Sequence, residues 1–348
     1  FMKYVTLFVF CYLFFSCKAE KKQMSNIFTS VVIEPVLQDS LLSIRAIDIL
    51  DDKSLAFAAN NNSYGLMNPI TKEWKISKKK LDSLELNFRA VAHTKKDFLM
   101  LSVGTPAFMF KTTNNGMKVC YKEIHPKVFY DSMLFWNDLE GIAVGDPTGD
   151  CMSIIITRDG GDSWNKLSCD MLPETANGEA AFAASNSNIS IVGNDTWIAT
   201  GGQQSRIFHS PDKGISWNAY ETPILKGAET TGIYSIDFYN DSLGFAIGGD
   251  YTKPDDMSAN KMYTSDGGKT WKLIGVNKEP GYRSCVQYVP YGEGQELVAV
   301  GFKGVDYSKD GGRNWTHLSD QSFYTLRFLN NNVAYAAGKG IVAMLTFE

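Results

Sequence analysis

The residues that could carry chemistry are carboxylates and arginines in polar segments between apolar stretches. Asp146 and Glu179 could act as general acid and general base, because glycoside hydrolysis needs one carboxyl group that gives a proton and one that accepts it. Arg206 and Arg283 could hold an anionic substrate, since each stands beside small residues that leave room for a long side chain. Beyond this candidate pair of carboxylates, the sequence assigns no catalytic residue.

A wider set of polar residues is expected on the same loop face. The candidate binding residues are Arg45, Arg89, Asp146, Arg206, Asp250, Tyr251 and Arg283. Charges brought together by a fold can bind an ionic group, or they can pair off as a structural network or form a rim for protein docking. Both interpretations stay open here, and we favour the second.

Composition removes other classes of function. The 348 residues hold 34 basic and 38 acidic side chains, a net charge of −4, without an extended run of Lys or Arg. Phosphate binding needs a concentrated basic face, so the sequence argues against nucleic acid as a partner. The histidines are scattered without partners at ligand spacing, so no metal and no cofactor are expected; they are His93, His125, His209 and His317.

The N-terminal residues have the pattern of an export signal. Lys3 is followed by an apolar run over residues 4–15, which is short for a membrane span. Residues 13–17 resemble a bacterial lipobox, with Cys17 as the lipidated residue, and the alternative is ordinary secretion. We expect a signal peptide over 1–17 and a polar tether over 18–26. Lys18 favours the outer membrane of the cell envelope, facing either the periplasm or the outside.

One short pattern recurs along the chain. It reads Ser/Thr-x-Asp-x-Gly-x-x-Trp, and four copies are complete, with the acids Asp159, Asp212, Asp266 and Asp310 and the indoles Trp164, Trp217, Trp271 and Trp315. A fifth copy over 112–119 is worn and has Val119 in the Trp position; a sixth keeps Thr71 and Trp74. In this Asp-box, Asp caps a tight turn, Gly tolerates positive φ and Trp packs between sheets. The boxes are therefore structural, not catalytic.

The repeat predicts a β-propeller. Two strands are expected before each box, the second being small and apolar and ending in Gly, as in residues 141–145, 244–248 and 297–301. Four antiparallel strands per repeat of about 45 residues are typical of a blade. Counting repeats gives seven blades in one domain over residues 27–348, the strand at 30–36 completing the last blade and so removing exposed edges.

The cysteines suggest one disulfide. Cys151 precedes the box at residues 157–164 and Cys169 follows it, so folding the hairpin about Gly160 places the two opposite each other. The alternative is two free thiols in the core. The redox state of Cys120 and Cys285 is left open.

Over nearly all of residues 27–348 the chain resembles the Asp-box propellers related to the photosystem II stability/assembly factor. The resemblance rests on the boxes and on residues 145–147, 248–251 and 281–284. It implies a scaffold that binds other proteins. Similar chains occur as lipoproteins in non-photosynthetic bacteria, and some carry the label oxidoreductase.

Other Asp-box families fit less well. Sialidases share an Arg-Ile-Pro motif that this sequence lacks, residues 43–46 reading Ser-Ile-Arg-Ala, and xyloglucanase-type enzymes are about twice as long. No Gly-x-Gly-x-x-Gly opens a helix and no Cys-x-x-Cys is present to support the oxidoreductase label. We therefore predict a monomeric, lipid-anchored envelope propeller that binds a protein partner as an assembly or stability scaffold. The alternative is a carbohydrate-active hydrolase or a glycan-binding module on the same face.

Overall fold

The computed structural model describes residues 27–81, 83–114 and 116–348. The predicted signal peptide, the lipidation site at Cys17 and the tether over 18–26 lie outside these residues. The described chain is almost entirely β, with one 3-10 turn, η1 (Cys169–Met171). In the described part of the chain, no helix has the length and apolarity needed to span a bilayer.

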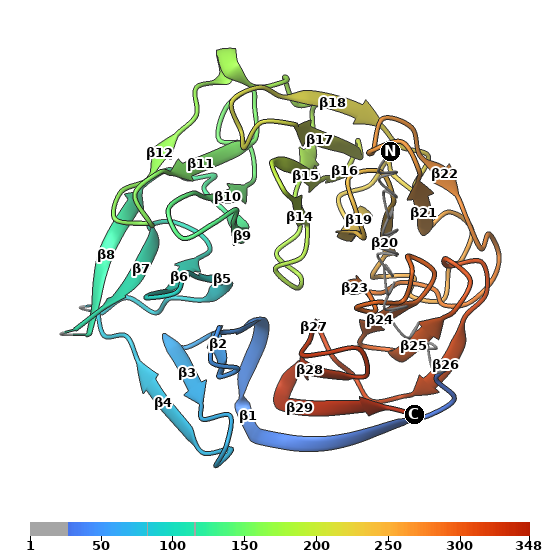
Figure 1. The fold of residues 1–348 in the computed structure, drawn as a ribbon. Helices are drawn as coiled ribbons and strands as arrows, with labels where there is room; N and C mark the ends of the chain where they lie inside the picture. The colour runs from blue at the N-terminus through green and yellow to red at the C-terminus, as the bar shows by residue number, and fades with distance from the viewer. Residues whose placement is uncertain (1–26, 82, 115) are drawn as a thin grey trace, which may run out of the picture.

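The strands form antiparallel sheets that follow one another around a common centre (Figure 1). One sheet joins both ends of the chain in the order β27-β28-β29-β1-β2-β3-β4. Its strands are β1 (Val31–Ile49), β2 (Leu55–Ala59), β3 (Ser63–Met67), β4 (Trp74–Lys78), β27 (Thr325–Phe328), β28 (Val333–Ala337) and β29 (Lys339–Phe347).

The remaining sheets have four strands each, except for one with six. Two of them are β5 (Phe88–His93), β6 (Phe98–Ser102), β7 (Ala107–Thr113) and β8 (Gly116–Glu123), then β9 (Tyr130–Phe135), β10 (Gly141–Gly145), β11 (Ser153–Thr157) and β12 (Asn165–Lys166). A third four-stranded sheet contains β14 (Ile189–Val192), β15 (Asp195–Ala199), β17 (Arg206–Ser210) and β18 (Asn218–Glu221). A fourth contains β23 (Cys285–Tyr288), β24 (Leu297–Gly301), β25 (Gly304–Ser308) and β26 (Thr316–Ser319). The six-stranded sheet contains β13 (Glu179–Ala180), β16 (Gly201–Gly202), β19 (Thr231–Phe238), β20 (Gly244–Asp250), β21 (Lys261–Thr264) and β22 (Lys272–Leu273).

The long strand β1 serves two partners. Its first part pairs with β29, from Val31 opposite Phe347 onward, and its last part pairs with β2, up to Ile49 opposite Leu55. Irregularities in register between these parts let the strand change direction. The N-terminal and C-terminal ends of the described chain are thereby hydrogen-bonded to each other.

Each complete box is a turn organised by one carboxylate. In the box at residues 157–164, Asp159 accepts hydrogen bonds from the Ser163 amide (3.0 Å), the Ser163 hydroxyl (2.6 Å) and the Thr157 hydroxyl (2.8 Å). Although burial opposes ionisation, these bonds lower the pKa of Asp159 to about 2. Gly161 has φ +84°, a conformation that other residues rarely adopt.

The box indoles fill the space between neighbouring sheets. Trp271 meets Phe238 edge-on at 5.9 Å, and Phe238 stacks at 3.6 Å on Trp197, which belongs to another sheet. The Trp315 ring lies 5.9 Å from the Phe245 ring, at a tilt of 56°. The core is therefore a series of apolar clusters between sheets, and each cluster fixes how two sheets pack.

The worn box corrects one detail of the sequence analysis. Strands β7 and β8 are joined by a tight hairpin in which Thr113 pairs with Gly116 and Thr112 with Met117. The hairpin is shorter than an Asp-box, so Met117 takes the Trp position. Val119, which the sequence placed there, is 44% exposed.

We expect Trp271→Ala to lower the free energy of unfolding by about 3–5 kcal/mol, because it leaves a large void between two sheets. Urea denaturation followed by far-UV circular dichroism measures this loss. The control is Ile215→Ala, at a box residue that is 67% exposed; its cost should stay within about 0.5 kcal/mol. Equal losses in the two variants would contradict the packing role.

Candidate functional site

A cavity of about 660 Å³ lies where the inner ends of several sheets meet. Its walls come from β1, β5 and β19, from the segments after β10, β13, β20 and β24, and from those before β9, β23 and β27. The lining side chains used below are Arg45, Arg89, Phe129, Asp146, Phe182, Glu229, Tyr234, Tyr251, Tyr282, Phe302 and Tyr324. We call this space the axial cavity. It brings together four of the predicted binding residues: Arg45, Arg89, Asp146 and Tyr251.

The two arginines are held by aromatic rings and main-chain carbonyls. The Arg45 guanidinium lies 4.0 Å from the centre of the Tyr324 ring, and its Nη1 donates to the Ala184 carbonyl (3.3 Å). Arg89 donates to the Ala183 carbonyl (3.4 Å), while its Nε has no hydrogen-bond partner in the described part of the chain. Burial and the positive charge of Arg45 both lower the pKa of Arg89. A bound anion would relieve this repulsion.

An aromatic cluster forms the opposite wall of the axial cavity. Phe182 stacks on Tyr234 at 4.0 Å, Tyr234 meets Tyr282 edge-on at 4.8 Å, and Tyr282 lies 5.3 Å from Phe302. Burial raises the pKa values of Tyr234 and Tyr282, so both are neutral at physiological pH. Tyr251 reaches further out and is 48% exposed. This wall can pack flat or apolar groups.

Asp146 is the carboxylate of the axial cavity with the most altered chemistry. It accepts a hydrogen bond from the Ala181 amide (2.8 Å), yet burial raises its pKa to about 6. Asp131 is fully buried nearby; desolvation and the charge of Asp146 raise its pKa well above the ordinary value, while Arg89 opposes the shift. The cavity therefore combines cations with one carboxyl group poised near neutral pH.

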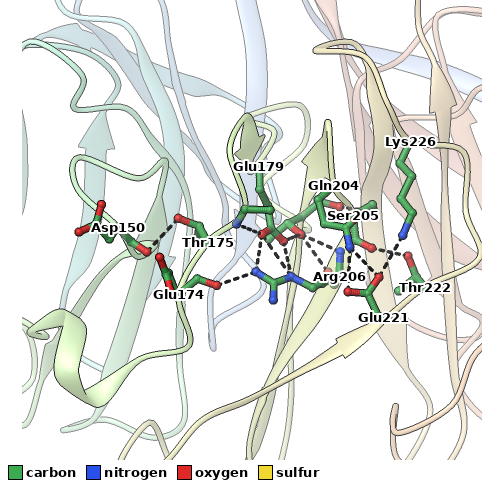
Figure 2. A network of polar contacts seen from close by, with 12 residues as sticks. Asp150, Glu174, Thr175, Glu179, Gln204, Ser205, Arg206, Glu221, Thr222 and Lys226 are labelled. Carbon is green, nitrogen blue, oxygen red and sulfur yellow. Dashed lines mark hydrogen bonds and ion pairs between the residues drawn. The ribbon is translucent and has the colours of Figure 1, made fainter.

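Glu179 is not available as the predicted acid or base. Its carboxylate is fully buried and faces the Arg206 guanidinium, with Nη2 to Oε2 at 2.5 Å and Nε to Oε1 at 3.1 Å (Figure 2). The Thr200 hydroxyl also donates to it (2.6 Å). Arg206 in turn donates to the Glu174 carbonyl (2.8 Å). The two side chains form a largely buried ion pair, so the charge of each is already balanced by the other.

Arg283 and Asp250 also support the site from behind rather than line it. Arg283 is 4% exposed, and its Nε donates to the buried Asp306 at 2.5 Å. Its Nη1 donates to the Tyr282 carbonyl (2.8 Å), which fixes an aromatic residue of the cavity. Asp250 is 6% exposed and caps a turn by accepting from the Thr252 amide (2.9 Å). Arg206, Arg283 and Asp250 therefore do not line the axial cavity, and each makes internal hydrogen bonds; that they contact a ligand stays a prediction.

Three of the four histidines lie beside carboxylates. His93 Nδ1 lies 2.7 Å from Asp48, and a hydrogen bond to that carboxylate raises the pKa of His93 despite burial. His209 Nε2 lies 2.7 Å from Asp195, and His317 Nδ1 lies 3.0 Å from Asp306. In the described residues, no group of three potential metal ligands comes together.

Cys151 and Cys169 form a disulfide with a Cα separation of 5.4 Å. They are not cross-strand partners as the hairpin argument expected. Cys151 forms an isolated antiparallel β-bridge with Glu174, and Cys169 begins the η1 turn. Cys169 is not in a strand because β12 is only two residues long and the chain leaves the sheet after it. Cys120 and Cys285 are free thiols; burial raises the pKa of Cys120 to about 12.

Sequence reasoning missed most of the aromatic cluster. Phe182, Tyr234, Phe302 and Tyr324 come from segments far apart in the chain, and nothing in their local sequence shows that they meet. One signal could have found Phe302, since it directly follows the Gly-ended strand at 297–301, just as Asp146 follows the one at 141–145. The residue after this glycine faces the axial cavity in both places.

The comparisons with known proteins agree on the architecture. A family model for the BNR/Asp-box repeat matches residues 262–273. The structure "YCF48 bound to D1 peptide" is similar with a TM-score of 0.64 and 14% identity, over 93% of this chain and 99% of that one. "YCF48 from Cyanidioschyzon merolae" gives 0.66 and 11%, over 91% and 99%. The WD40 β-propeller domain of Doa1 gives 0.61 and 12%, over 91% and 97%. No curated protein matches the sequence significantly.

The chain folds as a β-propeller. At these identities the likeness establishes the fold and leaves function to the site. Propellers commonly use the loops over their axis for binding, and the axial cavity lies at this place in the molecule.

We expect Arg206→Ala to cost about 3–5 kcal/mol of the free energy of unfolding, because it leaves the Glu179 carboxylate buried without its counter-ion. Arg158→Ala is the matched control: Arg158 is 41% exposed and pairs with Glu140 at 2.8 Å. That loss should stay below about 1 kcal/mol. Chemical denaturation of both variants tests the structural role, and a harmless Arg206→Ala would refute it.

We expect Asp146→Asn to stabilise the propeller at pH 7 but not at pH 4. The folded-state pKa of about 6 exceeds the ordinary 3.8, so folding favours the protonated acid and ionisation costs stability as pH rises between these values. Asn removes that cost, on the order of 1–3 kcal/mol at pH 7. Thermal denaturation from pH 4 to 7 measures it, with the exposed Asp150→Asn as control. A pH-independent difference between wild type and Asp146→Asn would contradict the raised pKa.

Proposed function

We propose that the protein is a protein-binding scaffold that docks a segment of its partner on the axial cavity. The observation that carries the proposal is the meeting of Arg45 and Arg89 with a wall of aromatic side chains. Arginines and tyrosines with one apolar face and one polar end are the residues that dominate protein recognition. Such a site suits a segment with an anionic group beside apolar or aromatic side chains.

The fold comparison adds support at the level of architecture. The structure "YCF48 bound to D1 peptide" has the same fold and holds a peptide, so a propeller of this kind can present a peptide-binding surface. By that analogy the role of this chain is assembly or stabilisation of a protein complex. The function rests on the cavity chemistry and on this analogy together.

We further propose seven four-stranded blades and attachment to the cell envelope. The seven-stranded sheet divides naturally at β1 into one blade of β27 to β29 with the first part of β1, and another of the last part of β1 with β2 to β4. The lipobox-like residues 13–17 favour a lipid on Cys17 and an outer-membrane lipoprotein. A single acyl-modified Cys would hold the propeller at a membrane face while leaving the axial cavity accessible.

Glycan binding or hydrolysis is the second candidate. The pKa of Asp146, raised to about 6 beside exposed and buried tyrosines, is the observation that favours it. Glu179 cannot complete a catalytic pair, and Glu229 is the other carboxylate that lines the axial cavity. An Asp146→Asn variant separates the two functions, since it would abolish hydrolysis while leaving capture of a protein partner intact.

We expect Arg45→Glu to reduce capture of the partner about tenfold or more in a cross-linked pull-down from native envelopes. The new carboxylate would also neutralise Arg89, whose charge interacts with position 45. Quantitative mass spectrometry of the captured proteins measures the effect.

Two controls define the outcome. Arg45→Lys keeps the positive charge, and Lys269→Ala with Lys272→Ala removes two exposed charges elsewhere; both should capture the partner as the wild type does. All variants should melt within a few degrees of the wild type. A partner captured equally by Arg45→Glu would overturn the axial-cavity proposal, and absence of any specific partner would direct attention to glycan binding and hydrolysis.

A further inference from the structure

A second hollow lies at the outer side of the propeller, between the sheet of β2 to β4 and the sheet of β5 to β8, at the lower left of Figure 1. Its volume is about 470 Å³. The floor is apolar, and the side chains that matter here are Ala56, Tyr64, Leu66, Phe98 and Met117. We call this space the junction groove. The junction groove and the axial cavity are separate, since they share no lining residue.

At four other junctions, the equivalent space is filled by a box indole. The residue that follows each box Trp pairs with the residue before the box, as Lys272 with Tyr263 and Thr316 with Tyr307. In β7 and β8 the corresponding pair is Lys111 and Lys118, so the residue in the Trp position is Met117. A flexible, narrower side chain thus replaces an indole here.

The facing strand β2 also carries a smaller side chain at this junction. In three other sheets, the Ser or Thr that begins the box pairs with a residue of the second strand, namely Gly141, Thr196 or Gly244. The next residue of that strand is large and apolar: Ile142, Trp197 or Phe245. Each packs in a cluster with the next Trp, namely Trp217, Trp271 or Trp315. In β2 this residue is Ala56. Both sides of the junction are therefore smaller than elsewhere, which accounts for the groove.

The rim of the junction groove favours an acidic ligand. Lys75 and Lys96 are exposed on opposite sides of it, on β4 and on the turn before β6. The three acids of the rim each have a partner: Asp97 pairs with Lys111 at 3.1 Å, Asp52 accepts from the Ser54 amide at 2.9 Å, and Asp51 lies 3.6 Å from His93 Nε2. A carboxylate beside an inserted ring would meet the two lysines.

We propose that the junction groove binds an extended peptide segment of another protein, with a tryptophan side chain in the groove and acidic residues against Lys75 and Lys96. The propeller itself shows that an indole fits at such junctions, because Trp164, Trp217, Trp271 and Trp315 each occupy one. Leu66, which is 42% exposed at the edge, offers further apolar contact. This surface is separate from the axial cavity and does not depend on the function proposed for it.

The test uses a defined probe, the dye-labelled peptide N-acetyl-Glu-Trp-Glu-amide, and fluorescence anisotropy with the intact chain. We expect measurable binding by the wild type, and at least about tenfold weaker binding when Ala replaces Trp in the peptide. Met117→Trp fills the groove with the protein's own indole and should weaken binding to the same extent. Met117→Leu leaves the groove open and should bind within about twofold of the wild type.

Further variants keep the test decisive. Ala56→Leu closes the groove from the other side and covers the case in which Met117→Trp fails to fold. Leucine is suitable because β6 has Leu99 at the equivalent position. Near-UV circular dichroism checks each fold. Three outcomes would overturn the proposal. The first is no binding by the wild type at about 1 mM. The others are that Met117→Trp and Ala56→Leu bind the peptide as tightly as the wild type does, or that the wild type binds the Ala peptide as tightly as the Trp peptide.

Two other occupants would be recognised as such. Loss of peptide binding in Arg45→Glu would place the peptide on the axial cavity instead, and would overturn the inference. Concentration-dependent self-association in sedimentation velocity that Met117→Trp abolishes would identify a second copy of the chain as the occupant, and would overturn it as well.

Discussion

Every sheet of this propeller has two apolar faces, and it can bury both only by standing between two others. This constraint explains why the core is divided into clusters between sheets instead of one central mass. It also explains the box, since a Trp at the start of the outermost strand is the piece that fills the wide end of the wedge between two twisted sheets. The carboxylate that organises the turn places that indole. Packing between sheets and the pairing of β1 with β29 then fix the arrangement of all inner loops.

Much of the buried charge near the axis is paired internally and holds the loops in place. Glu179 with Arg206, and Arg283 with Asp306, are close ion pairs whose side chains have little or no contact with water. Such pairs are costly to bury but more costly to break, so they make the conformation of the loops specific. What they leave exposed is the combination of Arg45, Arg89 and the aromatic wall. The shape of the axial cavity thus depends on a second layer of charges that does not line it.

The axial cavity and the junction groove arise from different causes. The axial cavity exists because loops from many sheets converge on one axis with large side chains at their tips. The junction groove exists because one junction departs from the repeat, with Ala56 and Met117 where bulkier residues stand elsewhere. A repeat protein tolerates such a departure, because each junction is stabilised locally and its neighbours keep their own indoles.

The sequence by itself determined the fold class, because the box is a local motif whose residues cap and wedge a turn wherever it occurs, and four complete copies repeat it. It also indicated which loops carry polar residues, and four of those residues do share the axial cavity. Only the tertiary structure decided which charges are free. Arg45 and Arg206 look alike in sequence, yet one faces the cavity and the other is bound to Glu179, because the partner of a buried charge is set by strands that meet in space. The same holds for the junction groove: the worn box was visible, but the position of Met117 followed from a hairpin register that only the folded sheet defines.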